Sequence, residues 1–143
     1  MSLYVIDAGV AVKWFIEEPD SDQAKKLLTN YFRWIDDLIA PDLIIAEVAN
    51  VLWKRAARGD LTAKEAKDSL IDLLSLNIPL ISSALLASKA LLLAQAHQRS
   101  VYDCLYLTLA LERGCSCITS DERLHNAIGQ VFPQLVLLRD LSL

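Results

Sequence analysis

Short apolar segments alternate with longer helical segments along the whole sequence, and this alternation constrains the fold more than any other feature. Short apolar runs bounded by turn residues predict strands, here at residues 3–6, 38–40, 78–81, 115–119 and 135–138. Strands that are apolar throughout and separated by helices are typical of a parallel sheet covered on both faces. We therefore predict a three-layer α/β/α fold with a central parallel sheet of about five strands.

Start and stop signals set the expected helix boundaries. Thr62 followed by Glu65 predicts a capping box, and Gly59 and Gly114 follow the last turn of two other helices. Together with apolar periodicity these signals predict helices over 9–17, 19–32, 43–58, 63–76, 83–99, 102–113 and 121–128. The helix at 83–99 is apolar nearly all round, which indicates burial on more than one side, either in the core or at a subunit interface.

Size and composition limit the class of protein. We expect residues 1–143 to form a single domain, because 143 residues are the usual size for one hydrophobic core. Apolar residues make up 54% of the chain, which excludes disorder. No apolar run has the roughly 20 residues that span a bilayer, and no signal peptide is recognisable. We expect a cytoplasmic protein that does not associate with membranes.

Glycine and cysteine usage exclude several kinds of site. The four glycines are too far apart for either common phosphate-binding loop. The cysteines are Cys104, Cys115 and Cys117, an odd number in a chain with no sign of export, so a disulfide framework is not expected. Neither His97 nor His125 has zinc-ligand spacing to them.

Four carboxylates stand where ligands bind in open parallel sheets, beyond the carboxyl ends of the strands. Asp7 directly follows the first strand and Asp121 follows the fourth, so both face one crevice if the sheet reverses its order between those strands. Asp103 lies in the first turn of its helix, and Glu47 lies about one turn into the helix after the second strand.

Each of these residues also has a purely structural interpretation. Asp7 and Asp121 can cap helices, and Asp103 can interact favourably with its helix dipole. Glu47 can be an ordinary solvated residue, but its neighbours are nearly all apolar, and a charge in such a stretch is rarely buried unless it is paired. Capping alone does not explain all four together.

Converging carboxylates repel one another, and a hard divalent cation relieves that repulsion. Oxygen-only ligands select Mg²⁺ or Mn²⁺. The net charge is −4, so the rest of the chain is neutral once these four acids are set aside. Basic side chains can then form a local patch for a polyanion; the candidates are Lys13, Lys54, Arg55, Arg58, Arg99 and Arg123.

The same residues carry a resemblance to a known family. Four segments in order resemble the motifs of the PIN-domain family, and within it the VapC-type toxins of toxin–antitoxin pairs: VIDAGVAVKWF at residues 5–15, AP at 40–41 with EVANVL at 47–52, YDCLY at 102–106, and TSDERL at 119–124. The resemblance covers essentially the whole chain.

This resemblance implies a metal-dependent endoribonuclease. Asp7, Glu47, Asp103 and Asp121 would be the catalytic residues and hold Mg²⁺ or Mn²⁺. Thr119 would support them by hydrogen bonding, and Asn50 would orient Glu47 or the end of the first strand. The implied partners are an RNA substrate, a cognate antitoxin that occupies the active-site groove, and a second copy in a homodimer.

One position departs from the family pattern. The family often has Ser, Thr or Asn two residues after the first Asp, where this chain has Gly9. A catalytically weak PIN-like module that binds RNA or protein is therefore an alternative. A phosphatase or receiver domain with Asp7 as nucleophile is a further alternative, but no second acid lies two residues after Asp7.

Overall fold

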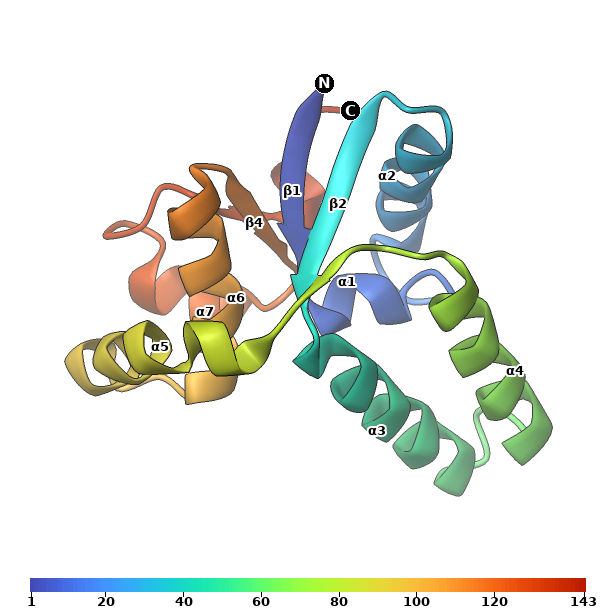
Figure 1. Cartoon of the computed structure of the whole chain (residues 1–143). Coiled ribbons are helices and arrows are strands. Elements are labelled where there is room, and N and C mark those ends of the chain that lie inside the picture. Colours follow the sequence, from blue (N-terminus) through green and yellow to red (C-terminus); the bar gives the residue numbers. More distant parts are fainter.

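A five-stranded parallel sheet forms the centre of the protein in the computed structural model, which describes residues 1–143 (Figure 1). The strands and helices follow in the order β1 (Ser2–Ile6), α1 (Ala8–Val12), α2 (Ser21–Phe32), β2 (Asp36–Pro41), α3 (Leu43–Ala57), α4 (Ala63–Ser75), β3 (Leu80–Ile81), α5 (Ser83–His97), α6 (Val101–Arg113), β4 (Ser116–Thr119), α7 (Glu122–Ile128), β5 (Leu135–Leu137) and the 3₁₀ helix η1 (Leu138–Asp140).

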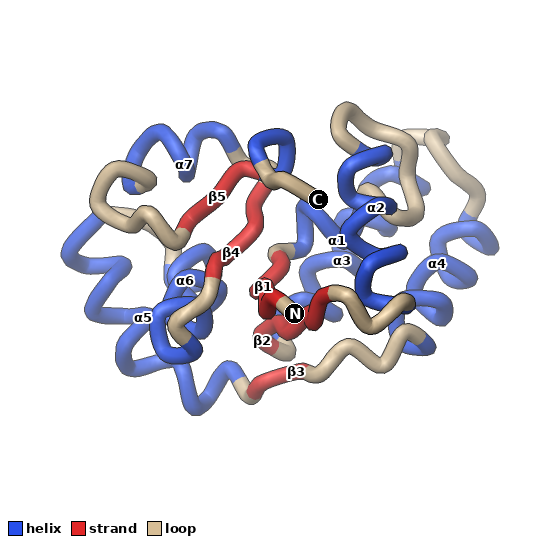
Figure 2. The backbone as a smooth tube through the Cα atoms, turned by 90° about the horizontal axis from the view of Figure 1, so that it is seen from above, coloured by secondary structure: helices blue, strands red, loops and turns tan.

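The strand order is β3-β2-β1-β4-β5, and every pairing is parallel. The chain thus builds outward from β1 first to one side and then to the other, so the order reverses between β1 and β4. Helices α5 and α6 lie on one face of the sheet and α1 and α2 on the other (Figure 2). The predicted three-layer α/β/α fold is confirmed, and the sheet has the order reversal that the shared crevice requires.

The core includes the sheet and the helices on both of its faces, among them α6 on one face and Val10 of α1 and Leu27 of α2 on the other. Val5, Ile6 and Ile118 in the central strands are completely buried, and seven consecutive residues of α6, from Cys104 to Ala110, are buried as well. A helix and strands that are apolar all round must lie inside the protein. The pair formed by α3 and α4 extends beyond the carboxyl end of β2, as Figure 1 shows. No helix has both the length and the apolar character to span a bilayer.

Helix α1 is shorter than the predicted helix at 9–17, because it ends at Val12. The Lys13 ammonium binds the Glu18 carboxylate 3.3 Å away, and the Trp14 indole N–H donates to the Ala24 carbonyl at 2.9 Å. Pro19 also disfavours helical backbone at Glu18. These contacts with residues further along the chain end the helix at Val12. The apolar periodicity of the sequence does not indicate such contacts.

Helix α5 is buried on one side only. Leu86, Ala90 and Ala94 pack into the core, whereas Leu85 is 77% exposed and Leu92 is 66% exposed. The expectation of burial on more than one side within the core is therefore wrong for this helix. The reason is that α5 lies outside α6, and α6 takes the inner position against the sheet (Figure 2).

Candidate active site

Asp7 and Asp121 lie at the carboxyl ends of neighbouring strands. The Asp7 amide donates to the Ile118 carbonyl at 3.3 Å, which ties the end of β1 to β4. Both residues cap helices: Asp7 Oδ1 accepts from the Val10 amide at 2.9 Å, and Asp121 Oδ1 accepts from the Leu124 amide at 3.0 Å. The capping interpretation is thus correct, and it orients both carboxylates at the same edge of the sheet.

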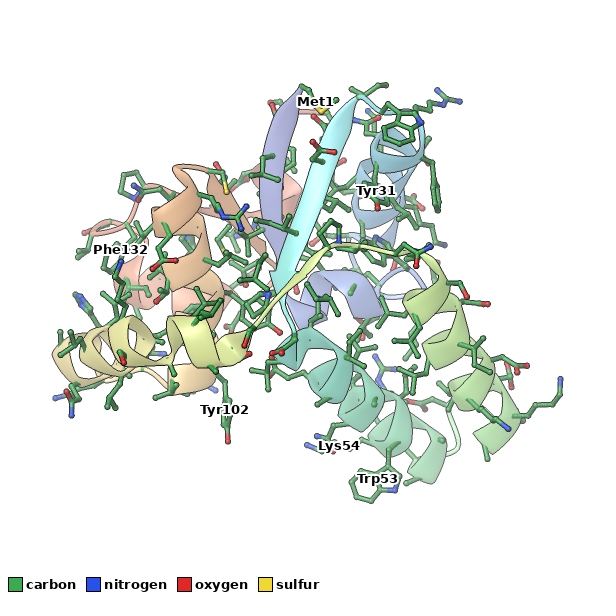
Figure 3. All side chains as sticks on the ribbon, viewed as in Figure 1. Met1, Tyr31, Trp53, Lys54, Tyr102 and Phe132 are labelled. Carbon is green, nitrogen blue, oxygen red and sulfur yellow. The ribbon has the colours of Figure 1, made fainter.

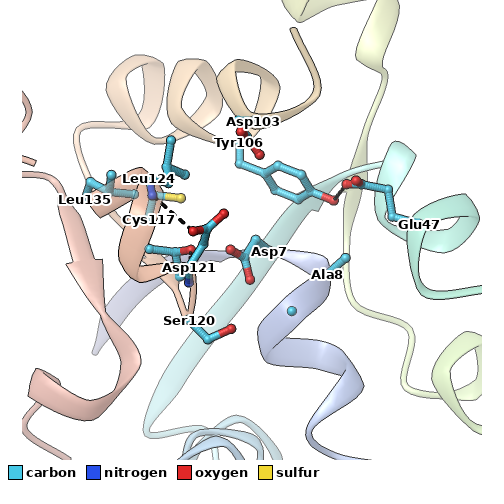
Figure 4. Close-up of a pocket in the computed structure, with 12 residues that line it drawn as sticks. Asp7, Ala8, Glu47, Asp103, Tyr106, Cys117, Ser120, Asp121, Leu124 and Leu135 are labelled. Carbon is cyan, nitrogen blue, oxygen red and sulfur yellow. Dashed lines mark hydrogen bonds between the residues drawn. The ribbon is translucent and has the colours of Figure 1, made fainter. Parts of the chain in front are cut away.

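Glu47 and Asp103 approach this edge from two helices, as Figure 4 shows. Glu47 lies on α3 and is half-buried, and its Oε1 accepts a hydrogen bond of 2.6 Å from the Tyr106 hydroxyl. Asp103 lies in the first turn of α6, three residues before Tyr106 and therefore on the same helix face. Tyr106 thus links α6 to α3 across the site.

These four carboxylates line one pocket of about 160 Å³. The wall between them is part polar and part apolar, and includes the buried Cys117 thiol and Tyr106. The complete lining is Asp7, Ala8, Gly9, Glu47, Asp103, Tyr106, Cys117, Thr119, Ser120, Asp121, Leu124 and Leu135. The structure therefore brings together four acids that are up to 114 positions apart in the sequence (from Asp7 to Asp121).

Burial makes the charged form of Asp7, Glu47 and Asp103 unfavourable. Burial and, to a smaller extent, the carboxylates of Glu47 and Asp103 raise the pKa of Asp7 to about 6, although hydrogen bonds from the Thr119 hydroxyl and the Val10 amide partly oppose them. Burial also raises the pKa of Glu47, against the effect of the Tyr106 hydrogen bond, and the pKa of Asp103, against that of Ser100. The Arg99 guanidinium lowers the pKa of Asp103 only in part, and none of the four acids forms an ion pair within the chain, so the site concentrates negative charge.

Thr119 and Asn50, expected as supporting residues, differ in position. Thr119 is completely buried, lines the pocket, and accepts a hydrogen bond from the Asp121 amide at 3.0 Å. Asn50 is exposed, does not line this pocket, and makes no hydrogen bond to Glu47. The group that orients Glu47 is Tyr106, which the sequence interpretation missed. The sequence feature that could have indicated Tyr106 is its hydroxyl, which lies one helical turn after Asp103 among mainly apolar residues.

Ser120 lies next to Gly9, the position that departs from the family pattern. A Cβ atom at Gly9 would stand 2.8 Å from the Ser120 Oγ and 3.4 Å from the Asp7 Oδ1. The Ser120 hydroxyl therefore occupies the place where a side chain at position 9 would begin. Ser120 is a second residue that the sequence interpretation missed, although it directly precedes Asp121.

The donor set fits a hard divalent cation. All four acids offer oxygen, and their repulsion is the kind that Mg²⁺ or Mn²⁺ relieves. No three acid, imidazole or thiol side chains form a ready-made ligand cluster. Mg²⁺ does not need one, because it keeps several waters and is commonly held through one or two carboxylates.

Half of the expected basic patch is neutralised within the chain. Lys13 and Arg55 bind the Glu18 carboxylate, and Arg55 and Arg58 bind Asp60 at 3.2 and 3.0 Å. The remaining candidates, Lys54, Arg99 and Arg123, form no ion pair. A patch of six cations is therefore not formed.

Comparison with known proteins agrees with this geometry. Residues 4–129 match the model of the PIN domain family. A parallel sheet with acids at the carboxyl ends of its central strands defines the class, and the chain belongs to the PIN-domain family.

Within that family the chain is a homologue of a VapC ribonuclease. It is 34% identical over 134 residues to Ribonuclease VapC3 of Pyrobaculum aerophilum, covering 92% of this chain and 96% of that one.

Two crystal structures share the fold. PAE2754 from Pyrobaculum aerophilum has a TM-score of 0.67 at 20% identity, over 96% of this chain and 92% of that one. VapBC2 from Rickettsia felis, bound to a DNA fragment from their promoter, has a TM-score of 0.61 at 15% identity, over 94% of this chain and 96% of that one.

Proposed function

We propose that the protein is an Mg²⁺- or Mn²⁺-dependent endoribonuclease and the toxin of a toxin–antitoxin pair, formed by one PIN domain over residues 1–143. The observation that carries this proposal is the one pocket that Asp7, Glu47, Asp103 and Asp121 line together, with no ion pair to any of them. The homology to a VapC ribonuclease supports RNA as the substrate. Such an enzyme would act in the cytoplasm.

The four acids would hold the cation and are the proposed catalytic residues. When bound, Mg²⁺ or Mn²⁺ activates water for attack on a phosphodiester and offsets the charge that builds up on the phosphate. Asp7 and Asp121 are held rigidly, because each uses one carboxylate oxygen to cap a helix. Both carboxylates line the pocket, where they can accept hydrogen bonds from ordered water.

Two neutral residues, Tyr106 and Thr119, would keep the acids in place. Tyr106 fixes Glu47 by donating its hydroxyl proton at 2.6 Å, and burial raises the pKa of Tyr106, so that the hydroxyl stays protonated as a donor. Thr119 holds the backbone of Asp121. Asn50 follows Glu47 by three residues on α3 but makes no hydrogen bond to it, so no contact supports its expected role in orienting Glu47.

The proposed protein partners are an antitoxin and a second copy of the chain. The fold shared with VapBC2 supports an antitoxin as a partner. The exposed side of α5, with Leu85, Leu91 and Leu92, is an apolar face suited to a homodimer contact. Sedimentation of the purified chain, with Leu92→Glu as the disrupting variant, tests the dimer.

The alternative is a PIN-like module that binds RNA or protein but turns over weakly, since Gly9 contributes no polar side chain. The position of the Ser120 hydroxyl, 2.8 Å from where a Cβ of residue 9 would be, argues against a site that has lost this function. Cleavage decides between the two.

The test is cleavage of a panel of single-stranded RNAs with Mg²⁺ or Mn²⁺, beside an EDTA control and Asp7→Asn. Asp37→Asn is the matched control, because Asp37 is an exposed acid on β2 at the opposite edge of the sheet. We expect metal-dependent cleavage by the wild type and Asp37→Asn only. Cleavage that persists in both EDTA and Asp7→Asn would contradict the proposal.

A further inference from the structure

A second pocket adjoins the carboxylates and is not used by the chemistry described above. It has a volume of about 460 Å³ and lies between α3 and the start of α6. It shares Ala8, Gly9 and Glu47 with the carboxylate pocket. Its complete lining is Ala8, Gly9, Leu43, Ala46, Glu47, Asn50, Val51 and Tyr102.

We propose that this second pocket binds one unpaired base of the RNA next to the scissile phosphate, with Tyr102 as the stacking surface and Asn50 as the hydrogen-bonding group. The inference rests on the proposed function, because it takes RNA as the substrate. It goes further in naming where a nucleotide sits and which form of RNA fits.

Tyr102 has the properties of a stacking residue. Its side chain is 60% exposed, whereas the other tyrosine of the same helix, Tyr106, is 4% exposed. Its hydroxyl makes no hydrogen bond within the chain, although it directly precedes the site residue Asp103. Exposed aromatic rings beside a nuclease site stack on bases of single strands.

The opposite wall is one face of α3. Glu47, Asn50, Val51 and Lys54 are spaced by three or four residues and therefore lie along the same side of the helix. Val51 gives an apolar contact for the second face of a base. The Asn50 amide offers a donor and an acceptor for a base edge, and it is exposed with no partner in the chain.

Lys54 continues this face away from the carboxylates. It lies about 10 Å along the helix from Glu47, and it forms no ion pair, unlike its neighbours Arg55 and Arg58. Figure 3 shows Tyr102 and Lys54 projecting into the open region beyond the carboxyl edge of the sheet. The ammonium group can therefore meet a neighbouring phosphate of a strand whose base lies in the pocket.

Gly9 lies at the boundary between the two pockets. It lines both of them, together with Ala8 and Glu47. A base held in the second pocket places the adjoining phosphate at Glu47, the acidic residue common to both pockets. A paired base cannot enter, since its face and edge are already occupied in the duplex.

The experiment measures RNA binding apart from cleavage. The Asp7→Asn chain, in EDTA, is titrated by fluorescence anisotropy into a random-sequence single-stranded RNA pool and into a duplex of equal length. Tyr102→Ala, Tyr102→Phe and Asn50→Ala are added to that background. Trp34→Ala is the matched control, because Trp34 is 81% exposed and precedes β2 at the amino edge of the sheet.

We expect Tyr102→Ala to weaken single-strand binding about tenfold and Tyr102→Phe to change it by less than about twofold, because the ring provides the stacking. Lys54→Gln, placed in the same Asp7→Asn background, should lower the slope of log affinity against log salt by about 0.7. Crosslinking of RNA that contains 4-thiouridine should map to Tyr102. Duplex binding should not respond to Tyr102→Ala.

Equal binding by Tyr102→Ala and Tyr102→Phe, a loss in Trp34→Ala of the same size, or no binding of the pool by any variant overturns the inference. Cleavage by the wild type separates this outcome from failure of the proposed function. Cleavage with Tyr102-independent binding leaves the nuclease and removes the base pocket. Tyr102-dependent binding without cleavage under any metal condition leaves the base pocket and removes the nuclease.

Discussion

Two groups of carboxylates in this protein have opposite surroundings. Glu18 and Asp60 are bound by Lys13, Arg55 and Arg58, so their charges are balanced within the chain. Asp7, Glu47 and Asp103 face one another instead, and burial raises the pKa of all three. The ion pairs of Glu18 and Asp60 connect the turn after α1 to the end of α3. The carboxylates of Asp7, Glu47 and Asp103 instead leave negative charge that a bound cation can neutralise.

The comparison separates stability from function. We call Glu18 and Asp60 the paired group, and Asp7, Glu47 and Asp103 the unpaired group. Removing a carboxylate from the paired group leaves a cation without its partner, which lowers the free energy of unfolding. Removing one from the unpaired group relieves repulsion, which increases stability but removes a cation ligand. The two groups should therefore respond to the same chemical change with opposite signs.

The largest expected effect is on cleavage. Asp103→Asn should lower the rate of RNA cleavage by about 100-fold or more, because it removes charge that holds the cation beside the phosphate. Glu112→Gln on the same helix is the control, since Glu112 pairs with Lys89 away from the pocket. A steady-state cleavage assay checks both variants, and full activity of Asp103→Asn would contradict its role.

The next effect is on the paired group. Glu18→Gln should lower the free energy of unfolding by about 2–3 kcal/mol, because Lys13 is 7% exposed and would lose its anionic partner. Cleavage below the unfolding temperature should be unchanged. Urea denaturation measures the free energy of unfolding. A Glu18→Gln variant that is as stable as the wild type but does not cleave RNA would contradict the assignment of Glu18 to stability alone.

Asp7→Asn should act in the opposite direction. Its folded-state pKa of about 6 lies above the ordinary 3.8, so the folded protein binds the extra proton between these pH values and loses stability as the pH rises through that window. Asparagine keeps the helix cap without the charge. We expect the metal-free variant to be more stable than the wild type by about 1–2 kcal/mol at pH 7.

Thermal unfolding at pH 4 and pH 7 checks this sign. The advantage of Asp7→Asn should be small at pH 4, where Asp7 is protonated in the folded wild type. Added Mn²⁺ should then raise the unfolding temperature of the wild type more than that of the variant, because only the wild type keeps the full ligand set. An advantage that is equal at both pH values would contradict burial of the charge as its cause.

The smallest expected effect is at Tyr106. Tyr106→Phe removes the hydrogen bond to Glu47 but keeps the ring, so cleavage should fall about tenfold through weaker cation binding. Raising the Mg²⁺ concentration should restore much of the rate. Loss that no metal concentration restores would show that Tyr106 acts in another way.

Much of this architecture was predictable from local patterns. The capping box at Thr62 formed as expected, with the Thr62 Oγ1 accepting from the Glu65 amide at 3.0 Å and the Glu65 carboxylate accepting from the Thr62 amide at 3.0 Å. Gly114 closes α6 in the left-handed region at φ 61°. Such signals involve neighbours within one helical turn, which is why a sequence reveals them.

The candidate site was predictable in part. Asp7 and Asp121 followed from their place at strand ends, and Glu47 stood out as a charge among apolar neighbours. The roles of Tyr106 and Ser120 did not follow, because the first depends on a partner 59 positions away and the second on the backbone of Gly9 across the sheet edge. The end of α1 at Val12 was missed for the same reason.

The sequence by itself determined the number, kind and order of the strands and helices, and with them the acids that follow the strands. Only the tertiary structure decided that β1 lies between β2 and β4, which lysine and arginine side chains are neutralised, and which face of α5 stays exposed. The physical reason is range. Periodicity and capping act within a few residues, whereas burial, charge pairing and shifted pKa values arise from groups that meet only when the chain has folded.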